Sequence, residues 1–156
     1  MQKISPSLWF DSEAFIAAQF YVSVFKNSRI IGTTDYPEGS HAAGSVLTVQ
    51  FVLDGVEFVA INGGPQYKFT PAISFVANCE TQEEVDRLWQ ELSAGGQEIQ
   101  CGWLVDRFGV SWQIVPTALP QMLASSDTAA TQRTFAAMLG MKKLDIAALQ
   151  RAYEGG

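Results

Sequence analysis

The sequence contains few of the residue types that most often carry catalysis or bind metals. Among 156 residues it has one histidine, His41, and two cysteines, Cys79 and Cys101. Two cysteines so far apart match neither a metal cluster nor a redox pair, and we expect both to be buried packing thiols in a reducing compartment. His41 lies in a stretch rich in turn residues, where a solvated side chain is expected. A catalytic Cys-His pair or Ser-His-Asp triad would require that loop to fold back over the cleft.

Basic residues and long apolar runs are also scarce. The chain has 10 Lys and Arg against 16 Asp and Glu, and the basic residues form no cluster. Nucleic acids and anionic membranes both demand a positive patch, so neither is an expected partner. No apolar run reaches the roughly 18 residues of a membrane span, and no signal-peptide pattern is present. We therefore expect a cytoplasmic protein whose partners are small molecules or other proteins.

The remaining composition is that of one globular domain, because 47% of the residues are hydrophobic and 156 residues can bury a sizeable core. The most informative stretch is 101–116. Strand signals at 101–105 and 110–115 flank a polar turn at 106–109, which predicts a hairpin. Along the second strand, Trp112 and Ile114 point to one face and are expected to pack under a helix. Ser111 and Gln113 point to the other face, which is expected to line a cleft.

The order of predicted elements repeats. Residues 1–64, called module one, read as a strand, a helix, a strand and a hairpin around Asp54-Gly55, the strongest short hairpin signal of the chain. Residues 69–116, called module two, repeat this order. The predicted elements are a strand at 3–10, a helix at 13–25 capped by Asp11-Ser12, strands at 29–34, 45–53, 56–62 and 69–78, a helix at 81–94 and strands within 97–116.

Residues 117–156 are predicted to form a helical tail, in which Asp127 and Asp145 cap two helices. The expected fold class is therefore α+β. Two βαβββ modules form curved mixed sheets around a cleft, within a single domain at 1–156, and C-terminal helices follow. Apolar residues at helical spacing in the tail have no strand of their own to cover, which favours a homodimer over packing on the same chain. These residues are Phe135, Met138, Leu139, Leu144, Ile146, Ala147 and Leu149.

Strand alternation also selects residues that would line the cleft. Phe58, Ala60 and Asn62 share one face of their strand, and Thr48 and Gln50 share a face of the preceding one. Polar side chains on one concave surface suit a small polar or aromatic ligand, because buried polar groups need partners. The predicted ligand-binding residues are Trp9, Thr48, Gln50, Phe58, Asn62, Trp103, Ser111 and Gln113.

Several segments closely resemble PhnB-like proteins of the vicinal-oxygen-chelate superfamily, which has the glyoxalase and bleomycin-resistance fold. The likeness extends over nearly the whole chain. The segments are LWFD at 8–11, FY at 20–21, NSRI at 27–30, NGGP at 62–65, FTPAISF at 69–75, TQEEVDRLW at 81–89, CGWLVDRFGVSWQIVP at 101–116 and MKKLDIAAL at 141–149.

Metal-dependent members of this superfamily resemble one another in placing one His, Gln or Glu on each of four strands. The equivalent positions fall at Gln113, near Ala60 and Ala72, and at Ser5 or Ser7. Zinc, nickel and iron sites need three or more strong donors, and an amide oxygen is a weak ligand. The expectation is therefore no catalytic metal, with Gln113 as the position where a divalent ion could attach.

PhnB-like proteins are often labelled 3-demethylubiquinone 3-methyltransferase. Methyltransferases of the common fold present a Gly-rich turn after a first parallel strand, and this chain has none. Two function hypotheses remain: a small-molecule-binding module without a metal, and a metal-dependent lyase, isomerase or dioxygenase-type enzyme. A purely structural interaction protein is a third, if the modules enclose no cleft.

Overall fold

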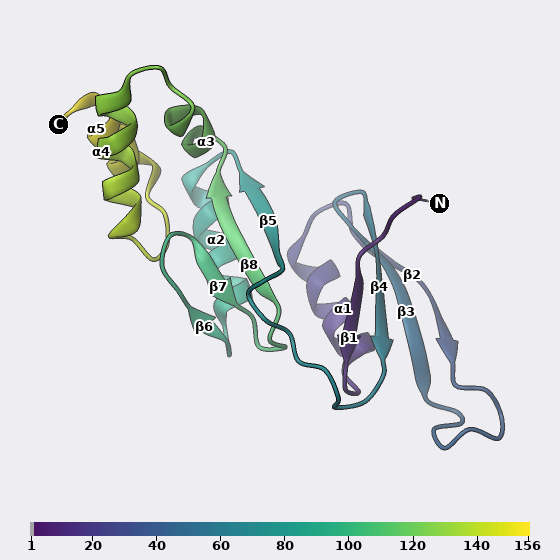
Figure 1. Cartoon of the computed structure of the whole chain (residues 1–156). Helices are drawn as coiled ribbons and strands as arrows, with labels where there is room; N and C mark the ends of the chain where they lie inside the picture. The colour runs from purple at the N-terminus through teal and green to yellow at the C-terminus, as the bar shows by residue number, and fades with distance from the viewer. Residues whose placement is uncertain (1) are drawn as a thin grey trace. The chain divides into compact units, whose positions relative to one another are not determined.

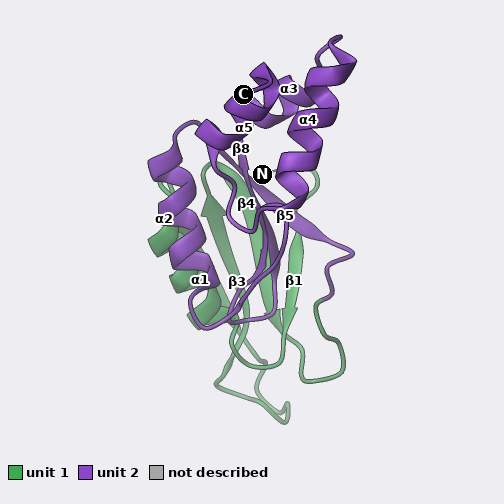
Figure 2. Ribbon diagram, turned by 90° about the vertical axis from the view of Figure 1, so that its left-hand side faces the viewer, with its two compact units in different colours: residues 1–69 green, residues 70–156 purple. Residues whose placement is uncertain are grey.

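The computed structural model describes residues 2–156, which form two compact units with a boundary along the chain between Phe69 and Thr70 (Figure 2). The first unit contains module one. The second contains module two and the helical tail. Each unit has its own four-stranded mixed sheet with a helix on one face (Figure 1). The predicted α+β class, with two βαβββ modules and C-terminal helices, is confirmed.

Module one has the strand order β1-β4-β3-β2, with β1 parallel to β4 and the other pairs antiparallel. Asp54 and Gly55 both have positive φ, as the two-residue hairpin between β3 and β4 requires. Helix α1 packs its small residues and Tyr21 on this sheet, and the Tyr21 ring stacks on Phe51 at 6.4 Å. The elements are β1 Ser7–Phe10, α1 Ala14–Val24, β2 Arg29–Asp35, β3 Val46–Leu53 and β4 Val56–Asn62.

The start of α1 differs from the prediction. Neither Asp11 nor Ser12 caps the helix, and Glu13 at the N-cap position makes no side-chain capping bond. Instead, the backbone N–H of Ala14 donates to Oδ1 of Asn62 at 2.8 Å. A side chain from the far end of β4 therefore satisfies one of the free donors that every helix start presents.

Module two repeats the first arrangement, with strand order β5-β8-β7-β6 and β5 parallel to β8. Thr81 caps α2 by accepting from the N–H of Glu84 at 3.2 Å, as predicted. Leu88, Trp89 and Leu92 are among the residues that α2 buries. The elements are β5 Ser74–Cys79, α2 Gln82–Ser93, β6 Gln97–Glu98, β7 Trp103–Val105 and β8 Ser111–Pro116.

Two strands begin later than predicted. β1 starts at Ser7 rather than residue 3, and β5 starts at Ser74 rather than Phe69. Pro6 and Pro71 lie within the two missing stretches, and proline removes the N–H that a strand ladder needs. Apolar composition alone therefore overestimated the length of both strands.

The turn between β7 and β8 is built around Asp106, which is only 2% exposed although it belongs to the polar turn at 106–109. Its Oδ1 accepts from the N–H groups of Phe108 and Val110 at 2.8 and 3.0 Å, and its Oδ2 accepts from Trp112 Nε1 at 2.9 Å. The carboxylate therefore organises the hairpin from inside.

The C-terminal tail consists of α3 Ala118–Leu123, α4 Thr128–Leu139 and α5 Ile146–Glu154, and it packs on module two of its own chain. Asp127 and Asp145 cap α4 and α5 as predicted. Leu144 and Leu149 are buried in a cluster with Leu119 and Met122. Leu144 and Leu149 therefore pack on their own chain and are not available for contact with a second chain. Phe135 and Leu139, in contrast, are about half exposed.

The segment before α5 is fixed by a side-chain clamp. Gln82 Nε2 donates to the Leu144 carbonyl at 3.0 Å, and Gln82 Oε1 accepts from the Ile146 N–H at 2.8 Å. Lys143 forms an ion pair with Asp86 at 2.8 Å, and this contact lowers the pKa of the Asp86 carboxyl. Within residues 2–156, no helix has the length and apolar character to cross a membrane.

Candidate functional site

The face of the second sheet opposite α2 brings together three of the predicted ligand-binding residues. Trp103 pairs with Gln113, and Val105 pairs with Ser111, so Trp103, Ser111 and Gln113 share this face. Trp112 and Ile114 are on the other face and are 4% and 0% exposed. The predicted orientation of β8, with Trp112 and Ile114 beneath the helix and Gln113 on the opposite side, is confirmed.

One polar contact and one buried hydroxyl group define this face, here called the Gln113 face. Gln113 Nε2 donates to Ser74 Oγ at 2.9 Å across the parallel pair of β5 and β8. The Oε1 atom of Gln113 is left to accept a further bond. Next to it, Ser111 is 2% exposed, and its Oγ has no hydrogen-bond partner among the described residues. An unsatisfied buried hydroxyl is uncommon and calls for a water or ligand group.

Module one places the other predicted residues on two different faces. Thr48 pairs with Ile61, and Ile61 pairs with Trp9, so Trp9, Thr48 and Gln50 share the face opposite α1. Thr48 and Thr34 join through their hydroxyl groups on that face. These three side chains thus lie together, as the prediction required.

Phe58 and Asn62 are on the α1 side of the same sheet, which corrects the prediction that they share a surface with Gln50. Phe58 pairs with Phe51 and stacks on it at 5.3 Å between centroids, and Phe51 in turn stacks on Tyr21 of α1. The physical reason is the register of the two-residue hairpin. It sets Phe58 opposite Phe51 and Gln50 opposite Val59.

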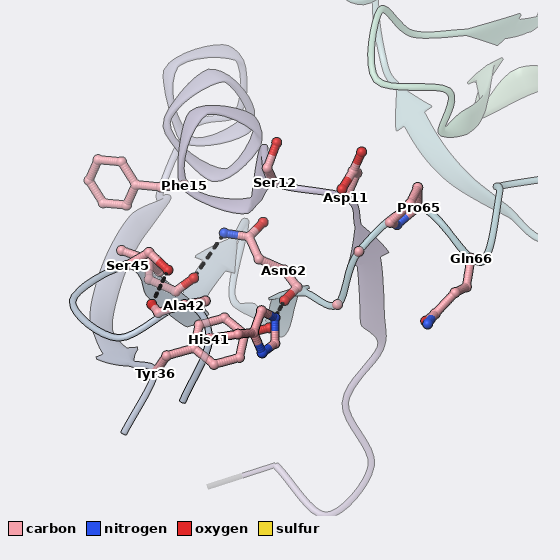
Figure 3. Close-up of a pocket in the computed structure, with 13 residues that line it drawn as sticks. Asp11, Ser12, Phe15, Tyr36, His41, Ala42, Ser45, Asn62, Pro65 and Gln66 are labelled. Atoms are coloured by element: carbon pink, nitrogen blue, oxygen red, sulfur yellow. Dashed lines mark hydrogen bonds between the residues drawn. The ribbon is translucent and has the colours of Figure 1, made fainter. Parts of the chain in front are cut away.

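Asn62 joins four segments of module one at the end of its sheet. Its Oδ1 accepts from the Ala14 N–H, and its Nδ2 donates to the Val46 carbonyl at 3.0 Å. Its backbone carbonyl accepts from the hydroxyl of Tyr36. Figure 3 shows Asn62 with Asp11 and Ser12 on one side, and with Tyr36 and His41 on the other. Both polar atoms of the amide that was predicted to bind a ligand therefore have a partner within the protein.

A cavity of about 600 Å³ lies around Asn62, here called the Asn62 cavity. It is bounded by the start of α1, the loop between β2 and β3, and the segment after β4 (Figure 3). Its volume falls in the range of pockets that hold small ligands. The thirteen lining residues are Asp11, Ser12, Phe15, Tyr36, His41, Ala42, Ser45, Val46, Asn62, Gly63, Gly64, Pro65 and Gln66.

Trp9 supports the floor of this cavity rather than forming an open wall. Its Nε1 donates to the Gly64 carbonyl at 2.9 Å, and its ring meets Tyr67 edge-on at 5.0 Å. A Cβ on Gly63 would lie 2.2 Å from the Trp9 ring. Glycine is therefore needed where the chain passes over the indole.

His41, Cys79 and Cys101 are the residues of the chain best suited to nucleophilic catalysis, and they lie in different environments. His41 is exposed, as expected, yet it lines the Asn62 cavity with its ring 5.8 Å from that of Tyr36. Cys79 is buried, and burial raises the pKa of its thiol to about 12, so it stays protonated at neutral pH. Cys101 is only partly buried, contrary to expectation.

Possible metal donors are scattered. Across residues 2–156, no three of the His, Cys, Asp and Glu side chains form a group that could hold a metal ion. Ala60 is buried and cannot act as a ligand. Gln113 Oε1 remains the single donor at the predicted position on β8.

Ser74 and the acidic and aromatic residues of the Asn62 cavity were not predicted as site residues. Ser74 could have been found from the parallel pairing of β5 with β8, which places it opposite Ser111. The sequence around Asp11, Phe15 and Tyr36 has no pattern that indicates a binding site. These residues come from separate segments, which only the tertiary fold brings to one cavity.

Comparison with known proteins identifies relatives for most of the chain. Residues 2–115 match the model of the family described as 3-demethylubiquinone-9 3-methyltransferase. A search of curated proteins gives no match. Among solved structures, a putative 3-demethylubiquinone-9 3-methyltransferase, PhnB protein, from Bacillus cereus is 35% identical with a TM-score of 0.69. That alignment covers 74% of this chain and 100% of the Bacillus protein.

Two more distant structures share the fold. A Pseudomonas aeruginosa protein is 21% identical with a TM-score of 0.62, over 74% of this chain and 98% of its own. The fosfomycin resistance protein FosX from Listeria monocytogenes is 14% identical with a TM-score of 0.56, over 80% of this chain and 98% of its own. At these identities the likeness shows the fold alone. By the family match and the Bacillus relative, the chain belongs to the 3-demethylubiquinone-9 3-methyltransferase family of PhnB-like proteins, within the vicinal-oxygen-chelate fold.

Proposed function

We propose that the chain binds a small polar or aromatic molecule on the Gln113 face and needs no catalytic metal to do so. The observation that carries the proposal is the buried hydroxyl of Ser111, which has no partner among the described residues. It lies opposite Ser74, whose Oγ holds the amide of Gln113. A ligand group or an ordered water bound by a ligand would complete this polar set.

Each residue of the face has a distinct role in this proposal. Gln113 presents a fixed amide whose Oε1 can accept from a ligand donor, since its Nε2 is already bound to Ser74. Trp103 lies directly across from Gln113 and is partly exposed, so its indole offers a flat apolar wall. Trp9, Thr48 and Gln50 form a similar surface in module one.

Methyl transfer, which the family description names, is not part of this proposal. Binding of S-adenosylmethionine in the common methyltransferase fold uses a Gly-rich turn between a parallel strand and a helix. In this chain the parallel partners of β1 and β5 are β4 and β8, and the turns that follow β1 and β5 contain no glycine. The alternative that stays open is a metal-dependent lyase, isomerase or dioxygenase-type enzyme with Gln113 as one ligand.

Metal content and a fragment screen would separate the two functions. We expect protein purified without chelator to contain far less than one Fe, Ni or Zn per chain by elemental analysis. In nuclear magnetic resonance spectra, we expect fragments that bind to shift the Gln113 side-chain amide and the Trp103 indole. Gln113→Ala should weaken those fragments about fivefold or more, because it removes a hydrogen bond.

The control is Gln90→Ala, which removes an exposed glutamine on α2. It should leave fragment binding unchanged. Stoichiometric metal that disappears in Gln113→Ala would favour the metal-dependent enzyme instead. A screen in which no fragment shifts either reporter resonance would refute ligand binding at this face.

We also propose a homodimer. Edge strands β1 and β5 each have one sheet neighbour, and edges of this kind present unpaired backbone groups. Phe135 and Leu139 are one helical turn apart on α4 and are 50% and 51% exposed. We expect light scattering at micromolar concentration to give twice the chain mass of 17.0 kDa.

The part of α4 in this assembly can be tested separately. Phe135→Ser with Leu139→Ser should shift the particle toward the monomer mass, whereas Gln121→Ser at an exposed position on α3 should not. A wild-type particle of about 17 kDa would rule out the dimer. An unchanged dimer in the double variant would remove α4 from the interface.

A further inference from the structure

We propose that the Asn62 cavity is a second binding site, in module one, and that it takes a small arylalkylamine: an ammonium group joined by a short chain to an aromatic ring. This goes beyond binding at the Gln113 face, which belongs to the other compact unit. Three features of the cavity support this proposal: its walls are held in place by the protein, most of its polar groups are already engaged, and its lining carries a negative charge.

The walls are held in place without a ligand. Asn62 connects the start of α1, the start of β3 and the end of β2 through three hydrogen bonds. Gly63 and Gly64 continue this network, because their N–H groups donate to the carbonyls of Phe10 and Asp11 at 2.9 and 3.2 Å. A cavity with a fixed lining loses little conformational entropy when a ligand enters.

Most polar groups of the lining are engaged. The hydroxyl of Tyr36 and both side-chain atoms of Asn62 are bound within the protein, and the hydroxyl of Ser45 donates to the Ala42 carbonyl at 2.6 Å. The carboxylate of Asp11, in contrast, accepts no hydrogen bond from residues 2–156. It is the one acidic side chain among the thirteen lining residues, and none of them is Lys or Arg. A ligand therefore meets one uncompensated negative charge.

The other side of the cavity is aromatic. Tyr36 and His41 lie together, across Asn62 from Asp11, whereas the ring of Phe15, also in the lining, points away from these two (Figure 3). An aromatic body resting on Tyr36 and His41 would place an ammonium group on the Asp11 side. The start of α1 would by itself favour an anion, but Asn62 occupies the Ala14 N–H, and an anion would face Asp11 at the same place.

Three probes of similar shape and different charge test the ligand class on the full chain: phenethylamine, 2-phenylethanol and 3-phenylpropionate. We expect phenethylamine to give saturable shifts of the Gly63 and Gly64 amide resonances in proton–nitrogen correlation spectra. The neutral alcohol should bind more weakly, and the carboxylate should give no saturable shift. This comparison needs only the wild-type protein, so it does not depend on how a variant folds.

Asp11→Asn should raise the dissociation constant of phenethylamine about fivefold, as for loss of a partly exposed ion pair. Glu38→Gln is the matched control, because it removes an exposed acid from the neighbouring loop outside the lining, and it should leave the constant unchanged. The proposal is overturned if phenethylamine gives no saturable shift, if the carboxylate binds as well as the amine, or if Asp11→Asn binds like wild type.

Discussion

Gly96→Ala is expected to destabilise module two by about 3 kcal/mol or more, the range of severe overpacking. Gly96 joins the end of α2 to β6, and its N–H donates to the Ser93 carbonyl at 2.9 Å. A Cβ at this position would lie 2.0 Å from the carbonyl oxygen of Val105 and 2.8 Å from the carbonyl carbon of Asp106. These atoms belong to the backbone of the paired strand and its turn, so no side-chain rotation relieves the clash.

Urea denaturation followed by circular dichroism measures this loss. Gly32→Ala on β2 is the control, because a Cβ there would meet no atom within 4 Å. Its effect should be within about 0.5 kcal/mol, as for surface substitutions in general. Equal unfolding midpoints for the two variants would show that the β6–β7 segment moves freely, contrary to the packing described above.

Asp106→Ala is the second substitution with a large expected effect. It removes the acceptor of three hydrogen bonds, two from backbone N–H groups of the turn and one from the Trp112 indole, at a position that is 2% exposed. Leaving a buried donor without a partner costs about 1–3 kcal/mol. We expect a loss of about 4 kcal/mol in total, because solvent can reach part of the opened turn.

Asp127→Ala provides the comparison for this carboxylate. Asp127 is an exposed residue that caps α4 through one bond, from the N–H of Ala130 at 3.0 Å, and losing such a cap costs about 1 kcal/mol. The Trp112 indole proton gives a second readout, since its resonance should move in Asp106→Ala and stay in Asp127→Ala. If both variants lost the same stability, Asp106 would be an ordinary surface acid.

The fold was predictable because its signals are local. Asp54-Gly55 defines one hairpin, and Thr81 with Glu84 defines the start of α2, and both act within a few residues of chain. The alternation of side chains along β8 was also predicted correctly. The prediction was wrong at 69–73, which was expected to be the start of a strand. This segment is apolar, but it contains a proline and lies before β5 begins.

The candidate site was predictable only in part. The hairpin at Asp54-Gly55 pairs Leu53 with Val56, and counting back from this pair places Phe58 with Phe51 rather than with Gln50. This correction was therefore available from the sequence. The Asn62 cavity was not, because Asp11 and His41 are thirty residues apart and meet through hydrogen bonds that no sequence pattern encodes.

The identical strand order of the two modules allows their sheet faces to be compared position by position. Asp106 pairs by backbone with Val110, as Leu53 pairs with Val56, so Gln113 corresponds to Val59 and Trp103 to Gln50. The two sheets thus differ at equivalent positions, one having a valine where the other has an amide. Strand pairing fixes the same backbone frame in both modules, and the side chains on the face opposite the helix can differ in chemistry without altering that frame.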